Sequence, residues 1–440
     1  MKHPPSESVQ PVPPPREVTP LDYARPAARP PVVLLYAVEG ITSHSVALML
    51  ASIYFYTTGR FGWDSGKNFL LAGVLGVVYV AGALSAHAIS TRLGRRRTLI
   101  VTYVLMSAAA ACALVGRHSP HYLVAALLFY SAASAITWPA LESLVSSGAA
   151  PGELSRRLGV YNCVWSGTGA LTVAAAGSVL KYWPAGTFVL PTVWHLAMAA
   201  LLWSVGRRGR LPADAPEGPP TDPAPHAAPE PELLAVRTLA LWMSRLALPA
   251  TFVVVSSLLA AMPTLPLIRR LDPTTRTVLG SVWMAARWGA FLFLGATAWW
   301  HTRPRALLGA AALLLVAFVA VTFRPEWLPG SPNVRTGVWV AWMAAWQVLL
   351  GAALGLIYSA SLYFGMVLSD GSTEHGGYHE ALIGLGTVIG PGAGALAEVV
   401  GGGNPLWGVA AVGVVLALSV LACGVVAVHR NGHNFPVEPA

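Results

Sequence analysis

Long apolar runs recur along almost the whole chain, and they constrain its fold more than any other feature. Hydrophobic residues make up 55% of the 440 and charged residues only 11%, whereas a soluble domain carries about 25% charged residues. A helix that crosses a bilayer needs about 20 mainly apolar residues. The sequence therefore predicts an all-α integral membrane protein. Twelve runs are long enough to span, at residues 32–57, 68–90, 98–116, 120–146, 157–180, 187–206, 238–266, 277–299, 305–323, 336–367, 379–402 and 405–429.

Arginines cluster between the second and third runs, in the order Arg92-Leu93-Gly94-Arg95-Arg96-Arg97. Each would cost about 2.5–3.5 kcal/mol inside the bilayer, so they mark a short cytoplasmic loop. If both termini lie in the cytoplasm, the cytoplasmic segments hold seventeen Lys and Arg residues and the segments on the other side hold nine. Positive charge is expected on the cytoplasmic side. The net charge of +9 is thus attributed to the orientation of the protein in the membrane, and no nucleic-acid partner is predicted.

Proline-rich segments divide the chain. Residues 1–30 have no apolar core typical of a signal peptide and are expected to be a disordered tail. Eight prolines fall in residues 207–236, which predicts a flexible linker between two groups of six spans. The expected organisation is a cytoplasmic tail, an N-terminal six-helix half, a cytoplasmic linker, a C-terminal six-helix half and a cytoplasmic tail, at 1–30, 31–206, 207–236, 237–429 and 430–440.

The arginine loop resembles the loop between helices 2 and 3 of major facilitator superfamily transporters. The family pattern is Gly-x-x-x-Asp-Arg-x-Gly-Arg-Arg, and this chain has His87 in place of the glycine and Thr91 in place of the carboxylate. A faint echo, Thr302-Arg303-Pro304-Arg305, follows the eighth run. The resemblance implies twelve helices in two six-helix halves and secondary transport of a small solute by alternating access, with proton coupling left open. The altered motif also allows a non-transporting sensor or assembly partner.

The resemblance further implies a monomer in a lipid bilayer, expected to be the bacterial cytoplasmic membrane, and a small-molecule substrate. No enzyme is predicted, since the sequence shows no catalytic constellation. Histidines lie at the start of the eleventh run, but the spacing of His375, His379 and Glu380 does not match the zinc-protease pattern. No metal and no cofactor are therefore predicted.

Polar residues inside membrane spans are functional candidates by default. The candidates for substrate binding or coupling are Glu39, Ser43, His44, Asn162, Trp165, Arg245, Arg287, Trp288 and Gln347. The resemblance implies that Glu39, Asn162, Arg287 and Gln347 could face one chamber. A carboxyl group in a low dielectric could exchange a proton, and an arginine could clamp an anion. The competing interpretation is a structural ion pair between Glu39 and Arg245 or Arg287.

A second set of candidates lies toward the cytoplasmic side and predicts a gate. Its members are Arg92, Gly94, Arg95, Arg96, Glu142 and Glu380. Since Thr91 replaces the family carboxylate, we expect Arg92 or Arg95 to pair with Glu142 or Glu380 instead.

Small residues gather in the eleventh run, at Gly384, Gly386, Gly390, Pro391 and Gly394. Such residues let membrane helices approach closely, which predicts a packing and hinge surface. The run also resembles the Gly-Pro-rich motif of facilitator antiporters, but that motif belongs to span 5, where this chain has no proline.

Overall fold

The computed structural model describes residues 32–147, 149, 151–207, 231–322, 336–368 and 373–434. The predicted tail at 1–30 and most of the predicted linker lie outside this part. Within it, twelve helices are long and apolar enough to cross a membrane, so the predicted all-α, twelve-span fold is confirmed. Helix α8 begins at Pro231, which makes the last residues assigned to the linker helical. Proline suits the first turn of a helix because the missing N–H would be unpaired there.

The N-terminal half contains six spans. Its elements are α1 (Val32–Val46), η2 (Ala47–Ala51), α2 (Ile53–Phe61), α3 (Ser65–Leu93), α4 (Arg95–Gly116), α5 (Pro120–Ser146), α6 (Pro151–Tyr182) and α7 (Gly186–Arg207). The first span is broken, since η2 is a π-helical segment between α1 and α2. Ser52 donates from its backbone N and its hydroxyl to the carbonyl of Ala47. Such π segments often mark functional sites.

The C-terminal half also contains six spans. Its elements are α8 (Pro231–Ala261), η3 (Met262–Thr264), α9 (Pro266–Arg269), α10 (Pro273–Gly280), α11 (Val282–Ala296), η4 (Trp299–Thr302), α12 (Arg305–Thr322), α13 (Thr336–Leu368), α14 (Thr373–Val400) and α15 (Pro405–Asn434). The eighth span is interrupted at Ser281, where α10 gives way to α11.

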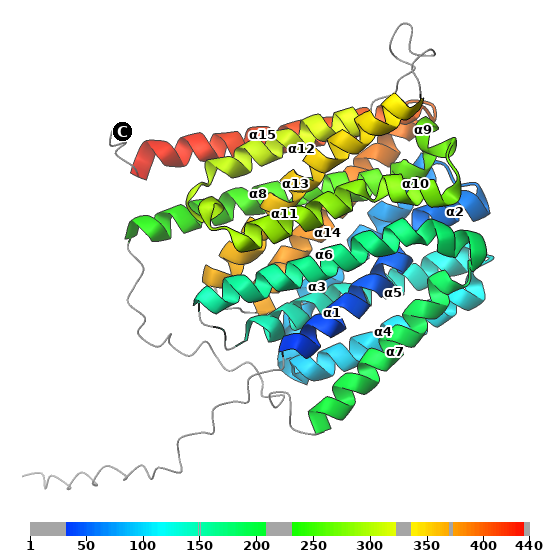
Figure 1. Cartoon of the computed structure of the whole chain (residues 1–440), viewed down its shortest axis with the longest axis horizontal. Coiled ribbons are helices and arrows are strands. Elements are labelled where there is room, and N and C mark those ends of the chain that lie inside the picture. Colours follow the sequence, from blue (N-terminus) through cyan, green and yellow to red (C-terminus); the bar gives the residue numbers. More distant parts are fainter. Residues whose placement is uncertain are drawn as a thin grey trace, which may run out of the picture.

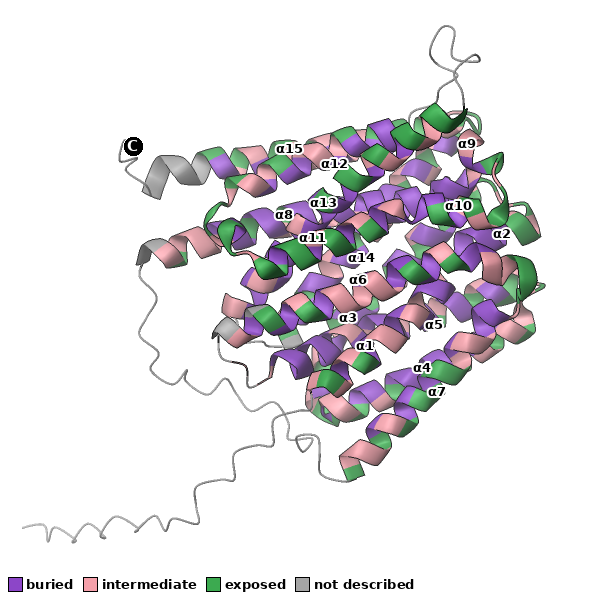
Figure 2. Ribbon diagram, in the orientation of Figure 1, coloured by how far each residue is buried: buried purple, intermediate pink, exposed green. Residues whose placement is uncertain are grey.

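The two halves lie side by side, with α6 against α10 and α11 and with α3 against α14 (Figure 1). We call the side that carries the α3–α4 turn the arginine face. The far face is the side where α2 and α6 end and α10 begins. Buried residues concentrate where helices face one another, and exposed residues line the outer surfaces (Figure 2). Many exposed residues are large and apolar, such as Val115, Phe129 and Leu171, as expected for contact with lipid tails.

The arginine-rich turn is a single glycine. Gly94 lies between α3 and α4 with φ 82° and ψ 146°. Residues other than glycine rarely adopt this backbone conformation. Its backbone N donates to the carbonyl of Ser90 and its carbonyl accepts from Thr98. The tight turn keeps the surrounding arginines together between the ends of α3 and α4.

The glycines of α14 separate into two faces. A Cβ on Gly386 would lie 2.2 Å from the carbonyl oxygen of Pro249 on α8, and Gly390 faces the same helix. Gly384 and Gly394 instead face α3, against Val80 and Phe69. Helix α14, with Pro391 inside it, is thus wedged between its own half and the other.

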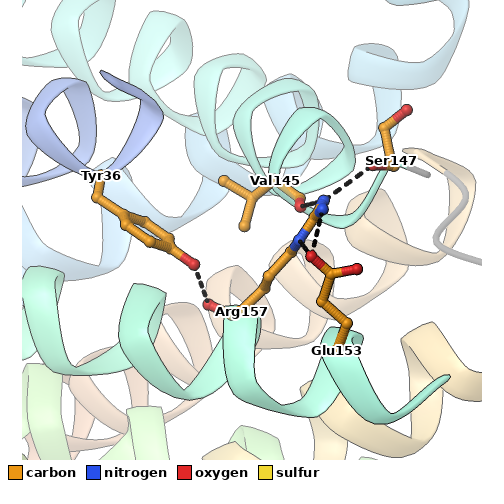
Figure 3. Close-up of polar contacts among 5 residues, drawn as sticks. All are labelled: Tyr36, Val145, Ser147, Glu153 and Arg157. Carbon is orange, nitrogen blue, oxygen red and sulfur yellow. Dashed lines mark hydrogen bonds and ion pairs between the residues drawn. The ribbon is translucent and has the colours of Figure 1, made fainter. Parts of the chain in front are cut away.

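Arg157 ties α5 to α6 at the arginine face (Figure 3). Its guanidinium donates to the carbonyls of Val145 at 3.2 Å and Ser147 at 3.0 Å, and it pairs with Glu153 at 2.8 Å. The Tyr36 hydroxyl of α1 donates to the Arg157 carbonyl at 3.2 Å. Carbonyls at a helix end have no partner within the helix, so this buried side chain supplies one.

We expect Arg157→Ala to destabilise the protein by about 1–3 kcal/mol, since it leaves buried acceptors unpaired. Thermal unfolding of purified protein in detergent measures the effect. Arg156→Ala is the matched control, because Arg156 is exposed and carries the same charge. Equal unfolding temperatures for the two variants would contradict a structural role for Arg157.

Candidate functional site

A cavity of about 240 Å³ lies between the two halves. Its lining comes from the first span, α3, α5 and α6 on one side and from α8, α11, α13 and α14 on the other. Aromatic side chains dominate it, namely Tyr54, Tyr79, Trp138, Tyr161, Trp165, Phe252, Trp283 and Tyr358. Few polar groups join them, which is typical of a small-molecule pocket.

Glu39 lies at this cavity on α1 and is fully buried. The Ser43 hydroxyl, one helical turn further on, donates to Glu39 Oε1 at 2.7 Å. Glu39 Oε2 has no hydrogen-bond partner among the described residues. The π segment η2 follows immediately and lines the cavity through Ala47, Leu50 and Ala51. The carboxyl group is therefore held by Ser43, and Tyr161 of α6 interacts with it as well.

Arg287 brings a positive charge from α11 into the same cavity. Its guanidinium carbon lies 4.3 Å from the ring centre of Trp165 and 5.1 Å from that of Trp283. Trp165 belongs to the N-terminal half and Trp283 to the C-terminal half, so the cation contacts both. The ring faces stabilise the charge. The side chain is 4% exposed and its Nε has no hydrogen-bond partner in the described chain.

Two further carboxyl groups lie close enough to Glu39 to interact electrostatically. Glu380, on α14, lines the cavity and accepts a hydrogen bond from the Tyr79 hydroxyl. Glu142, on α5, is fully buried, and neither of its carboxyl oxygens has a partner among the described residues. An unpaired buried carboxylate is costly, whereas the neutral acid is tolerated. The three groups form an acid cluster that spans both halves.

Of the nine predicted binding and coupling residues, four line the cavity. These are Glu39, Ser43, Trp165 and Arg287. Two others orient the lining: the Asn162 side chain accepts from Trp165 Nε1 at 3.2 Å, and Gln347 accepts from the Trp283 backbone N at 3.4 Å.

The remaining three point elsewhere. His44 bonds Thr172 at 2.8 Å, and Arg245 contacts His375 at 2.8 Å. Trp288 is 43% exposed and packs over Gly167. None of these three residues is part of the cavity lining.

The structure does not form the ion pair that the competing interpretation placed between Glu39 and Arg245 or Arg287. The closest partner of Glu39 is Ser43, and Arg287 lies on tryptophan rings. Arg245 is bound by His375 at the edge of a separate small cavity.

The expected ion pair of the gate is also not formed. Arg95 Nη1 donates to the Ser143 hydroxyl at 3.0 Å, one residue away from Glu142 on α5. Neighbouring residues on a helix point about 100° apart, so Glu142 faces the interior and Ser143 faces the loop. Arg92 is exposed, and Arg96 packs over Gly206 of α7. Glu380 faces the cavity and bonds Tyr79.

Four tyrosines of the cavity were not among the predicted residues, namely Tyr54, Tyr79, Tyr161 and Tyr358. For Tyr161 a signal existed, because it lies four residues before Trp165 and shares its face of α6. Tyr358 contacts Trp165 with ring centres 5.1 Å apart, across the two halves, and no local pattern predicts such a contact.

Comparison with known proteins agrees with this architecture. The family model of the Major Facilitator Superfamily matches residues 32–372, which is more than half of the chain. A comparison with curated proteins found no match. The chain, with its twelve spans in two halves around a central cavity, therefore belongs to the Major Facilitator Superfamily of membrane transporters.

Proposed function

We propose that this protein is a secondary active transporter that moves a small solute by alternating access and couples the movement to protons. The observation that carries the proposal is the cavity between the halves that contains both Glu39 and Arg287. A sensor or scaffold of this fold has no need of buried charges at its centre. Aromatic walls, one cation and two carboxyl groups suit a small solute with both polar and apolar parts.

The acid cluster offers a means of coupling. Glu39 and Glu142 belong to one half and Glu380 to the other, and Gly376 of α14 packs close to Glu142. Ionised carboxylates on both sides of this contact would repel one another. Protonation would remove the repulsion and favour the closed contact between α5 and α14. Release of a proton would favour its opening.

We further propose that the arginine face and both termini lie in the cytoplasm, that the protein sits in the bacterial cytoplasmic membrane, and that it acts as a monomer. The excess of Lys and Arg on that face supports the orientation. A cysteine-accessibility assay at Arg97→Cys, on the arginine face, and His118→Cys, on the far face, tests it in intact cells.

The test of transport is an uptake panel. Purified protein in proteoliposomes is offered mixtures of small anions, zwitterions and cations, with and without a pH gradient, and the trapped solutes are identified by mass spectrometry. We expect one class to accumulate only with the gradient. The non-transporting alternative predicts that no solute accumulates above empty liposomes, while binding of a solute still raises the unfolding temperature.

A further inference from the structure

A second cavity, of about 370 Å³, opens at the far face. We call it the basic vestibule, and it is lined by four cationic side chains and one histidine, namely Arg60, Arg117, Lys181, Arg276 and His118. Arg60 ends the first span, Arg117 and His118 connect α4 to α5, Lys181 ends α6, and Arg276 lies in α10. The vestibule is thus built from both halves.

The charge of the basic vestibule is not balanced. No Asp or Glu is among its lining residues in the described chain. Asp272 interacts electrostatically with Lys181, but its carboxylate already accepts from the backbone of Thr274 and Thr275 and from the Thr275 hydroxyl. Four permanent cations therefore share a small space with one nearby carboxylate. At physiological salt, screening over about 8 Å is incomplete, so the cations repel one another.

The guanidinium groups are held in place by neutral acceptors. Arg117 Nη1 donates to the Leu114 carbonyl at 2.7 Å. Arg276 donates to the carbonyls of Leu271 at 2.6 Å and Arg269 at 2.7 Å. A guanidinium has five N–H donors, so each retains donors beyond these bonds. Fixed donors bind an anion with little loss of side-chain freedom.

His118 contributes a neutral acceptor. Its Nδ1 lies 2.8 Å from Arg60 Nη2. Its pKa is lowered by desolvation and by the nearby charges of Arg117 and Arg60. The ring thus orients Arg60 without adding a fifth charge.

Helix dipoles explain only part of this cluster. Arg60, Arg117 and Lys181 lie at the C-terminal ends of helices, where a cation is favourable. Arg276 lies in the first turns of α10, where the dipole disfavours a cation. A dipole effect also gives no reason for all four to surround one cavity.

We propose that the basic vestibule binds an oxyanion group, such as a carboxylate, sulfate or phosphate. Bound between the N-terminal half and Arg276, the anion neutralises the repulsion between the two halves at the far face. Gly177 and Thr277 already join the halves there, with the Gly177 N donating to Thr277 Oγ1 at 3.0 Å. The site goes beyond the proposed transport, because binding in it does not require movement of a solute.

The test measures sulfate and phosphate binding to the purified full-length protein in detergent by calorimetry, at constant ionic strength set with sodium chloride. We expect saturable binding that Arg60→Gln with Lys181→Gln weakens about tenfold or more, because hydrogen bonds to charged groups are lost. These two side chains are exposed and do not bond the backbone in the described structure. Lys67→Gln with Arg270→Gln removes the same charge on the same face outside the vestibule and should leave binding unchanged.

A second measurement does not depend on any variant. The proton resonances of His118 in the wild-type protein should shift on addition of sulfate, and its pKa should rise as the anion offsets the neighbouring cations. No saturable binding, equal binding by both double variants, or an unmoved His118 signal would overturn the proposal.

The source of the oxyanion is distinguished in nanodiscs. If a lipid headgroup occupies the basic vestibule, phosphatidylglycerol discs should weaken sulfate binding relative to phosphatidylcholine discs. Equal affinity in the two kinds of disc identifies a free anion as the occupant. Both outcomes leave the site itself in place.

Discussion

Proteoliposomes that contain Glu39→Gln are expected to lose solute accumulation driven by a pH gradient while retaining the fold. Glutamine has the same shape and can still bond Ser43, but it cannot bind and release a proton. One coupled proton moved through one pH unit supplies about 1.4 kcal/mol, or a tenfold concentration ratio. The wild-type accumulation ratio should rise about tenfold per pH unit, and that of the variant should stay near one. The measurement uses the solute identified in the uptake panel.

Two further variants make this experiment specific. Glu374→Gln is the matched control, since Glu374 lies on α14 like Glu380 but is exposed and outside the cavity lining. It should leave the dependence on pH gradient intact. Glu380→Gln should reduce the dependence because Glu380 belongs to the acid cluster. A Glu39→Gln variant that accumulates solute as the wild type does would remove Glu39 from the coupling.

Gly386→Ala is expected to lower the stability of the protein, because it forces two closely packed helices apart. The new Cβ would lie 2.2 Å from the Pro249 carbonyl oxygen and 2.9 Å from Phe252 Cβ, so α8 and α14 must separate. Overpacking of this kind costs about 1–3 kcal/mol. Membrane helices depend on close packing, because lipid provides no hydrophobic drive for their association. Thermal unfolding in detergent, followed by size-exclusion chromatography, measures the loss.

The same helix offers the control. A Cβ on Gly392 would meet no atom within 4 Å, and Gly392 is exposed. Alanine favours a helix over glycine by about 1 kcal/mol, so Gly392→Ala should be neutral or slightly stabilising. If Gly386→Ala unfolds at the same temperature as Gly392→Ala, then the α8–α14 contact is not the close approach described above.

The spans were predictable because the bilayer imposes a local rule. Each crossing needs about 20 apolar residues wherever it lies in the fold, so composition and the arginine loop were sufficient. The breaks within the helices were harder to predict from the sequence. The long first run was expected, but the π segment at Ala47–Ala51 depends on a single extra residue in one turn, which no apolar pattern records.

The contacts of the predicted gate depend on how distant helices pack, which no short stretch of sequence determines. The sequence predicted that the arginine loop and Glu142 lie at the same end of the bundle, and in the structure they do. Arg95 nevertheless bonds Ser143 rather than Glu142. Ser143 and Glu142 are neighbours on α5 and point about 100° apart, so the hydroxyl faces the loop and the carboxyl group faces the interior. Packing against other helices sets the rotation of α5 and so decides which of the two meets Arg95.

The sequence by itself determined that this chain crosses a membrane twelve times, that it divides into two halves and that charges such as Glu39 and Arg287 lie within the spans. These properties follow from the cost of transferring each side chain into lipid, which is a property of single residues and short windows. The tertiary structure decided which polar residues meet. It placed Glu39, Trp165 and Arg287 at one cavity with Glu380, and it left Arg245 and Trp288 outside the lining of that cavity. Contacts between distant helices depend on how each helix is rotated, and only packing fixes that rotation.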